Sequence, residues 1–363
     1  MKAIILVGGE ATRLRPLTCN TPKAMVSVLN KPFLEHVIRH LNTHKVTEIV
    51  LALSQHQQSI EGYFGDGKQL GIKLHYSIEN TPLGTGGALK NAEKYLDETF
   101  LVLNGDIITD LDITDMMHFH QSRKANVTIA RLPMDNPTGY GLIETDANGR
   151  ITRFIEKPSP NDITTNQINA GTYIFEPDIL ACIPPQAKFS IEHEFFATLP
   201  EKQEISAWGY DYSTYWMDTG TPEKYLQLHR DLLYGKSTCY TPPTTSLIGK
   251  QSQIHPTAKI HGPVIIGDNC NIESNVMLTG PIVIGSGCTI QSGAIIADSV
   301  IWDNTHIGHS TVVKSCVIAN NCYLNADCIA QGSSLGDNVV VLNCCQLKSG
   351  SNILPGTLIE ADT

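Results

Sequence analysis

Aliphatic residues recur at every sixth position through the last third of this chain. A first unbroken run is followed by three shorter runs, each entered after the register shifts: Ile254, Ile260, Ile266, Ile272, Leu278, Ile284, Ile290 and Ile296; Ile301, Ile307 and Val313; Ile318 and Leu324; Leu335, Val341, Leu347, Ile353 and Ile359. An α-helix repeats every 3.6 residues or so and a strand every second residue, roughly, so neither explains this period. The chain must contain a fold whose own repeat is six residues long.

A six-residue period is typical of a β-helix, in which three faces close one triangular coil and the aliphatic residue of each face points inward. On this pattern residues 253–359 resemble the left-handed parallel β-helix family. Five cysteines each follow an aliphatic marker by four residues, at a position that favours small side chains: Cys270, Cys288, Cys322, Cys328 and Cys345. We expect them to be buried and free, with Cys270 stacked on Cys288 in the next coil.

The first two-thirds of the chain alternates short apolar runs with amphipathic stretches. We predict strands within 2–9, 48–54, 73–79 and 99–106, and helices within 32–44, 59–67 and 86–96. This alternation predicts an α/β fold, a Rossmann-like doubly wound mixed sheet with helices on both faces. Such sheets bind ligands beyond the carboxyl ends of their strands.

The composition changes near residue 236, where a polar stretch with a Pro-Pro pair begins. We therefore predict a catalytic domain over 1–235, a linker over 236–252 and a β-helix domain over 253–363.

Charge and length exclude several classes of protein. The chain has 363 residues and a formal net charge of −10, which argues against nonspecific nucleic-acid binding and against anionic membranes. The apolar start before Gly8 is too short for a signal peptide or a membrane span, so we expect a cytoplasmic protein.

A local positive cluster opposes the acidic balance at the first turn, "GGEATRLRPLT" (8–18). Gly8 and Gly9 can bring backbone N–H groups close to a phosphate. Arg13 and Arg15 add guanidinium forks that bind phosphate oxygens in pairs, and Lys23 adds a compact charge. We expect this segment to bind phosphates, with Arg15 either a second clamp or a structural cation.

The longer string "GGEATRLRPLTCNTPKAM" (8–25) resembles the signature of the sugar-1-phosphate nucleotidyltransferases, GGxGTRLxPLT followed by PK. The chain departs from that pattern at Ala11, where the family usually has glycine. Alanine is less free than glycine to adopt a positive φ, and its methyl group would lie near the phosphates, so this departure concerns the fine geometry of the loop and not the assignment.

Further motifs follow the same family in order, and the resemblance implies a role for each. "PLGTGGAL" (82–89) resembles the nucleotide-base loop, with Gly84 and Thr85. "NGD" (104–106) and "YWMDTGTPEKY" (215–225) supply Asp106 and Asp218 as ligands of a divalent cation, expected to be Mg²⁺. On the sugar side stand "GYGLIETD", "FIEKP" and "NAGTYIFEPDIL", which supply Gly141, Glu156, Lys157, Asn169 and Gly171.

The implied reaction joins a nucleoside triphosphate to a sugar 1-phosphate and releases pyrophosphate, with Arg13, Lys23, Asp106 and Asp218 as catalytic residues. The two-part arrangement resembles the mannose-1-phosphate guanylyltransferases, which implies GTP and mannose 1-phosphate as substrates and a homo-oligomer. The thymidylyl- and uridylyltransferases of glucose 1-phosphate stay open as alternatives, as does a catalytically silent regulatory protein. A sugar acetyltransferase in the β-helix is a further alternative, with His255, His261, His306 and His309 as candidates.

Overall fold

The computed structural model describes residues 1–9, 11–54, 57–238 and 246–360. They form two compact units, and neither is continuous in sequence. The first comprises Met1–Gly9 and His36–Trp216, and the second Glu10–Glu35 and Met217–Thr363. The domain boundaries expected from the sequence stay a prediction, and residues 239–245 of the expected linker lie outside the described residues.

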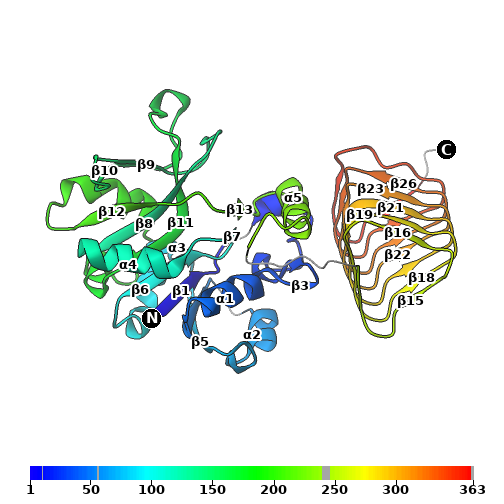
Figure 1. The fold of residues 1–363 in the computed structure, drawn as a ribbon, viewed down its shortest axis with the longest axis horizontal. Coiled ribbons are helices and arrows are strands. Elements are labelled where there is room, and N and C mark those ends of the chain that lie inside the picture. The colour runs from blue at the N-terminus through cyan, green and yellow to red at the C-terminus, as the bar shows by residue number, and fades with distance from the viewer. Residues whose placement is uncertain (10, 55–56, 239–245, 361–363) are drawn as a thin grey trace. The chain divides into compact units, whose positions relative to one another are not determined.

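The first unit is built on a nine-stranded mixed sheet (Figure 1). Strands β6, β1, β4 and β5 run parallel, and β11 lies antiparallel beside β6. The strands β1 and β4 are almost wholly buried because helices cover both faces of a parallel sheet, and their sequences KAIIL and EIVLAL are accordingly continuous apolar runs. The bounds of its strands are β1 Lys2–Leu6, β4 Glu48–Leu53, β5 Lys73–Ile78, β6 Phe100–Asn104, β8 Val127–Pro133, β9 Leu142–Thr145, β10 Ile151–Ile155, β11 Gln167–Phe175 and β12 Ala207–Asp211. The short strand β7 Ile107–Thr109 lies outside this sheet.

The expected strands and helices of this region are confirmed. The helices are α1 Phe33–Thr43, α2 Gln58–Phe64, α3 Gly84–Asn91 and α4 Ile113–Arg123. Short turns of helix join them, namely η3 Lys68–Leu70, η4 Glu93–Tyr95, η5 Pro160–Asp162, η6 Pro177–Cys182, η7 Ile191–Phe195 and η8 Phe196–Glu201. The helix expected over 86–96 is interrupted at Ala92, where α3 gives way to η4.

The second unit contains the signature loop, helix α5 Pro222–Leu233 and the β-helix. The loop includes two short 3₁₀ turns, η1 Thr12–Leu14 and η2 Lys23–Met25, and a hairpin of β2 Ser27–Val28 and β3 Lys31–Pro32. The side chain of Thr221 caps α5 by accepting a hydrogen bond from the backbone N of Lys224 (3.4 Å).

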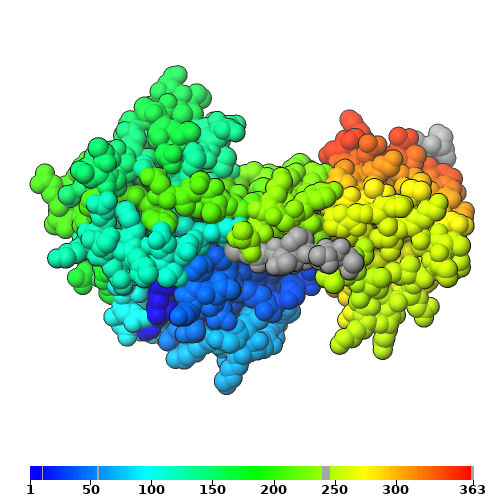
Figure 2. All heavy atoms as spheres, viewed as in Figure 1, coloured from blue at the N-terminus to red at the C-terminus, as the bar shows by residue number. Residues whose placement is uncertain are grey.

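The β-helix consists of short parallel strands stacked coil on coil (yellow to red in Figure 1), and Figure 2 shows the same region with its heavy atoms as spheres. Its first strand, β14, lies within the expected linker and already pairs with β17. The handedness stays a prediction. The strands are β14 Leu247–Ile248, β15 Gln253–Ile254, β16 Lys259–His261, β17 Val264–Ile266, β18 Asn271–Ile272, β19 Met277–Ile284, β20 Thr289–Ile290, β21 Ile295–Ile301, β22 His306–Ile307, β23 Val312–Lys314, β24 Val317–Ile318, β25 Tyr323–Leu324, β26 Ile329–Gln331, β27 Ser334–Leu335, β28 Val340–Val341, β29 Asn352–Ile353 and β30 Leu358–Ile359; β13 Trp216–Asp218 precedes α5.

Every aliphatic marker of the six-residue period belongs to one apolar core inside the coils. The markers from Ile266 to Leu347 are buried, and those near both ends are partly buried. Ala330 occupies the marker position that the sequence pattern skipped between Leu324 and Leu335. The inward-facing prediction is therefore confirmed.

The interruptions of the period shorten the coils without disturbing the stack. Thr289 pairs with His306, a coil of 17 residues, whereas Asn271 pairs with Thr289, a coil of 18. The shortened steps follow Ile296, Val313 and Ala330, which lie directly above one another. Because three successive coils lose one residue at the same corner, their aliphatic residues stay in register.

The five β-helix cysteines are buried, as expected, and Cys316 is a sixth that the pattern missed. The strand register places Cys270 beside Cys288 in the next coil. Burial raises the pKa of Cys316 to about 11 and that of Cys322 to about 12, which keeps both thiols protonated. All cysteines within the described residues are free, and those residues contain no helix long and apolar enough to cross a bilayer.

Candidate active site

The carboxyl ends of β1 and β6 bring two of the expected motifs together. Leu6 pairs with Asn104 in the sheet, so Gly8 and Gly9 leave β1 beside the turn that carries Asp106. The backbone N of Gly105 donates to the carbonyl oxygen of Leu6 (3.0 Å), and a Cβ at Gly105 would lie 2.7 Å from that oxygen. Glycine is therefore required at this position of the NGD motif, and Gly9 adopts a φ of 108° that also favours glycine.

Strand β11 places Asn169 and Gly171 at the same edge of the sheet. A Cβ at Gly171, whose φ is 69°, would lie 2.7 Å from Nδ2 of Asn104. The side chain of Asn169 is fixed at both ends, because its Oδ1 accepts from the backbone N of Gly171 (2.9 Å) and its Nδ2 donates to the hydroxyl of Tyr173 (2.9 Å). The structure thus gathers the NAG and NGD motifs.

Gly141 and Glu156 lie beside Asn169. A Cβ at Gly141 would come within 2.7 Å of Oε2 of Glu156 and 3.4 Å of the Cβ of Asn169. The missing side chain leaves space for the carboxyl group of Glu156, which is only 14% exposed. Burial, with a smaller contribution from Glu192, raises the pKa of Glu156.

Lys157 differs from its neighbour in exposure and in backbone conformation. Its side chain is 68% exposed, and its Nζ lies 3.9 Å from Oε1 of Glu156, a weak surface pair. Its φ of 47° places a non-glycine residue in the left-handed region. Such a conformation costs about 1 kcal/mol or more and often marks a functional position.

Sequence reasoning missed Glu192. Its Oε2 accepts hydrogen bonds from the hydroxyls of Thr85 (2.6 Å) and Ser190 (2.7 Å). Its charge also raises the pKa of Tyr173, after the larger effect of burial. Glu192 thus connects the expected base loop with the expected sugar side. It lies in η7 outside every recognised motif, so no sequence signal identified it.

Close packing explains the glycines that open α3. A Cβ at Gly84 would lie 2.7 Å from the carbonyl oxygen of Phe189, and one at Gly86 would lie 2.5 Å from the ring of Phe189. That carbonyl accepts from the backbone N of Gly86 (2.9 Å) and of Gly87 (3.2 Å). The base-binding role of Gly84 and Thr85 stays a prediction, while the glycines themselves are required by the neighbouring segment.

Within the second unit, Arg13 and Asp218 lie on either side of Gly220. A Cβ at Gly220 would be 3.2 Å from Oδ2 of Asp218 and 3.5 Å from Nη2 of Arg13. Asp218 also pairs with Lys224, a cation that sequence reasoning missed although it lies in the same motif. Thr221 rather than Asp218 caps α5.

The loop that carries Arg13 and Lys23 starts from a strained residue. Ala11 has φ 44° and ψ 42°, in the left-handed region that glycine favours. Its carbonyl oxygen accepts from the backbone N of Leu14 (3.0 Å) and from the hydroxyl of Thr18 (2.9 Å), which holds the turn closed. Ala11 thus adopts the positive φ that a glycine would adopt more freely. Lys23 is partly buried in η2.

The candidate acetyltransferase histidines differ in their surroundings within the β-helix. His306 stacks on Tyr323 with ring centroids 5.8 Å apart, and Nδ1 of His309 lies 3.1 Å from the hydroxyl of Ser292. Nδ1 of His255 lies 2.9 Å from the hydroxyl of Thr257, and His261 is exposed.

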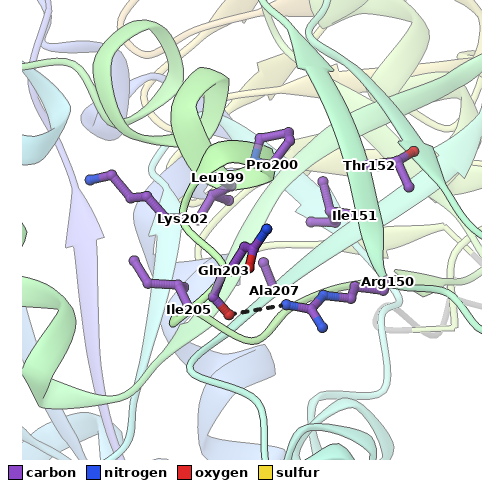
Figure 3. A pocket seen from close by; sticks show the side chains of 9 residues that line it. All are labelled: Arg150, Ile151, Thr152, Leu199, Pro200, Lys202, Gln203, Ile205 and Ala207. Atoms are coloured by element: carbon purple, nitrogen blue, oxygen red, sulfur yellow. Dashed lines mark hydrogen bonds between the residues drawn. The ribbon is translucent and has the colours of Figure 1, made fainter.

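One cavity of about 500 Å³ lies elsewhere in the first unit, between β10, β12, η8 and the segment that follows η8 (Figure 3). Arg150 and Lys202 supply its cations, and the guanidinium of Arg150 donates to the carbonyl oxygen of Gln203 (3.4 Å). Its lining contains none of the expected site residues.

Comparison with known families identifies the fold that carries this site. The family model described as nucleotidyl transferase matches residues 2–235, and the model described as GMPPB C-terminal domain matches residues 260–363. This chain belongs to the nucleotidyl transferase family. It is therefore an enzyme of nucleotidyl transfer, as the signature string predicted.

Relatives align over most of the chain. It is 36% identical to the mannose-1-phosphate guanylyltransferase of Mycobacterium tuberculosis, over 73% of each chain. It is 37% identical to the mannose-1-phosphate guanyltransferase of Candida albicans, over 100% of this chain and 98% of that protein. The UTP–glucose-1-phosphate uridylyltransferase of Synechocystis is 33% identical over 85% of this chain and 84% of its own.

A solved structure is similar to the nucleotidyltransferase region. The crystal structure of HddC from Yersinia pseudotuberculosis complexed with GMP-PN matches with a TM-score of 0.54 and 32% identity. It covers 62% of this chain and 96% of that one. The protein of that structure binds a guanine nucleotide analogue.

Proposed function

We propose that this nucleotidyltransferase transfers the guanylyl group of GTP to mannose 1-phosphate, giving GDP-mannose and pyrophosphate. The observation that carries the proposal is the alignment over the whole chain with a mannose-1-phosphate guanyltransferase, which includes the β-helix. The similar uridylyltransferase favours glucose 1-phosphate with a pyrimidine nucleotide as the second candidate.

The reaction needs positioning and charge neutralisation rather than a general base. The attacking oxygen of the sugar phosphate is already anionic, and it displaces pyrophosphate in line at the α-phosphorus. The backbone N–H groups of Gly8 and Gly9 would contact the triphosphate, and Arg13 and Lys23 would neutralise the charge that develops on it. Exposed Lys157 would hold the sugar phosphate for attack.

The sugar would be bound by the gathered motifs of β9 to β11. The carboxyl group of Glu156 and the backbone of Gly141 and Gly171 would contact its hydroxyls, together with the fixed amide of Asn169. The base would lie on Gly84 and Thr85, a placement that the bond from Thr85 to Glu192 would stabilise.

Nucleotidyltransferases of this kind generally use a divalent metal, and we propose Mg²⁺ held by Asp106 and Asp218. Mg²⁺ is usually bound by one or two carboxylates while substrate phosphates and water complete its shell. Asp106 and Asp218 would supply two carboxylates, which is the number of protein ligands that this pattern needs. A bound cation would neutralise phosphate charge.

We further propose a cytoplasmic homo-oligomer. An apolar ladder runs along the outside of the β-helix, in which Met277, Ile295, Val312 and Ile329 lie in register on successive coils. Met277 and Ile329 are 38% and 40% exposed. Exposed apolar surface of this kind favours association, and light scattering on Ile329→Lys should then give a lower mass than on the unchanged protein.

The test is pyrophosphate release with Mg²⁺ over a grid of five nucleoside triphosphates and the 1-phosphates of mannose, glucose and N-acetylglucosamine. A dominant signal with GTP and mannose 1-phosphate is expected, and a dominant signal elsewhere would overturn the substrate proposal. Binding of GTP without turnover of any sugar 1-phosphate would indicate a catalytically silent regulatory protein. Consumption of acetyl-CoA with an amino-sugar phosphate would indicate a second, acetyltransferase activity.

Variants of the two aspartates test the site itself. Asp106→Ala and Asp218→Ala should each lower turnover by orders of magnitude while circular dichroism stays unchanged. Asp66→Ala is the matched control, because the side chain of this aspartate is 61% exposed and forms a surface ion pair with Lys68. Near-normal rates in either site variant would remove that carboxylate from the mechanism.

A further inference from the structure

One corner of the β-helix carries a column of polar side chains from successive coils, which we call the corner ladder: Asp268, Ser286, Asp303, Asn320 and Asp337. Several of these side chains accept hydrogen bonds from the backbone of the preceding coil. Oδ1 of Asp303 accepts from the backbone N of Ser286 (2.7 Å), and Oδ1 of Asp337 accepts in the same way from that of Asn320 (3.0 Å). The ladder is a structural feature of the β-helix.

Asp337 differs from the other aspartates of the corner ladder in its burial and in its partners. Asp268 and Asp303 are exposed, whereas Asp337 is 8% exposed. Its Oδ2 accepts a hydrogen bond from Nδ2 of Asn20 (3.1 Å), and its Oδ1 also accepts from Nδ2 of Asn320 (3.0 Å). A buried carboxylate must be satisfied by donors, so the bond from Asn20 matters to Asp337.

Asn20 belongs to the signature string, between Arg13 and Lys23. The same loop is held again at the hairpin of β2 and β3, where Nδ2 of Asn30 donates to the carbonyl oxygen of Ile284 in the β-helix (2.8 Å). The stretch from Asn20 to Asn30, which contains Lys23, is thus bonded to the β-helix at both ends.

Helix α5 adds a third connection within this unit. The hydroxyl of Tyr225 donates to the carbonyl oxygen of Ser27 and accepts from Nε1 of Trp302 in the β-helix (2.9 Å). The helix itself is fixed by Arg230, whose guanidinium binds both carboxylate oxygens of Asp298 (2.7 and 2.5 Å). The β-helix therefore supports the signature loop directly and through α5.

We propose that Asp337 is a positioning residue for nucleotidyl transfer, which acts through Asn20 to fix the loop that presents Arg13 and Lys23 to the phosphates. This inference rests on the proposed function, because it takes both cations as phosphate-binding groups. Charge stabilisation depends on groups held close to their working positions, and small displacements of a loop lower the rate steeply. The β-helix thus contributes to catalysis without touching substrate.

The kinetic test compares Asn20→Ala, Asp337→Ala and their double variant. Each single change should lower kcat about 10-fold, with the KM for the sugar 1-phosphate within about twofold, because the loop acts on the triphosphate. The double variant should lose no more than the worse single variant, since both remove one bond. Asp303→Ala is the matched control, because it removes the equivalent ladder bond at the same corner, two coils away from Asp337.

An exchange of the two groups tests the bond itself. Asn20→Asp alone sets two carboxylates against each other and should lower kcat further than Asn20→Ala. Adding Asp337→Asn restores a donor opposite an acceptor and should recover most of the lost rate. A general structural role of Asp337 predicts no such recovery.

Hydrogen exchange of the amides of residues 11–26, measured without substrate, separates this inference from the proposed function. Exchange should rise in Asn20→Ala and Asp337→Ala and stay unchanged in Asp303→Ala. If the unchanged protein releases no pyrophosphate with any substrate pair, the proposed function fails, and the exchange still decides whether Asp337 fixes the loop. Equal effects of Asp303→Ala and Asp337→Ala, or unchanged exchange in both loop variants, would overturn the inference.

Discussion

Replacing Ala11 by glycine should stabilise the protein, although glycine normally destabilises. Ala11 has φ 44° and ψ 42°, and the left-handed conformation costs an L-residue about 1–2 kcal/mol. Glycine avoids that cost but loses about 0.5–1 kcal/mol more conformational entropy on folding. The net gain for Ala11→Gly is therefore about 0.5–1 kcal/mol, which corresponds to a rise in Tm of about 1–2 °C for a chain of this size.

The assay is differential scanning fluorimetry and urea unfolding of Ala11→Gly beside Ala147→Gly. Ala147 is also an alanine in a turn, and it is exposed, but its φ is not positive. Ala147→Gly should therefore lose about 0.5–1 kcal/mol. The reasoning fails if both variants are destabilised alike, because the backbone strain at Ala11 would then be absent in solution.

Three further predictions concern residues that differ in burial. Ile290→Ala in the fully buried β-helix core should cost about 2–5 kcal/mol in urea unfolding, and Ile290→Val only about 0.5–1.5 kcal/mol. Burial lowers the pKa of His40 to about 4, so the stability that its neutral form contributes is complete above about pH 6.5 and is lost as the pH falls toward 4. The fall in Tm between pH 7 and pH 4.5 should therefore be smaller in His40→Gln than in the unchanged protein. An equal fall in both proteins would contradict this prediction. Iodoacetamide should label exposed Cys19 and Cys344 in the native protein and leave Cys322 unlabelled, as read by mass spectrometry.

The signature loop belongs to a different structural unit from the one that its position in the sequence suggests. The loop lies in the N-terminal part of the chain, yet residues 10–35 form one compact unit with α5 and the β-helix. Asn20 and Asp337, the pair that joins them, are 317 positions apart in the sequence. A substitution in the β-helix can therefore affect the phosphate-binding loop without touching any recognised motif.

Periodicity and glycine patterns were sufficient to predict much of the fold. The six-residue period gave the β-helix because each face is defined by its own side chains and by equivalent residues one coil away. The apolar runs that end in Gly8 and in NGD gave the parallel strands and the edge where the motifs meet. The positive φ of Ala11 was not predicted, because alanine in place of the family's glycine left the conformation of the loop open.

The sequence by itself determined which residues face inward and where strands end, because those properties depend on neighbours along the chain. Only the tertiary structure decided that Glu192 binds Thr85, that Lys224 pairs with Asp218, and that Ala330 fills the core where the period is broken. It also decided which aspartate of the corner ladder is buried. These contacts depend on the path of the chain in space, since the choice of a particular partner leaves no period in the sequence.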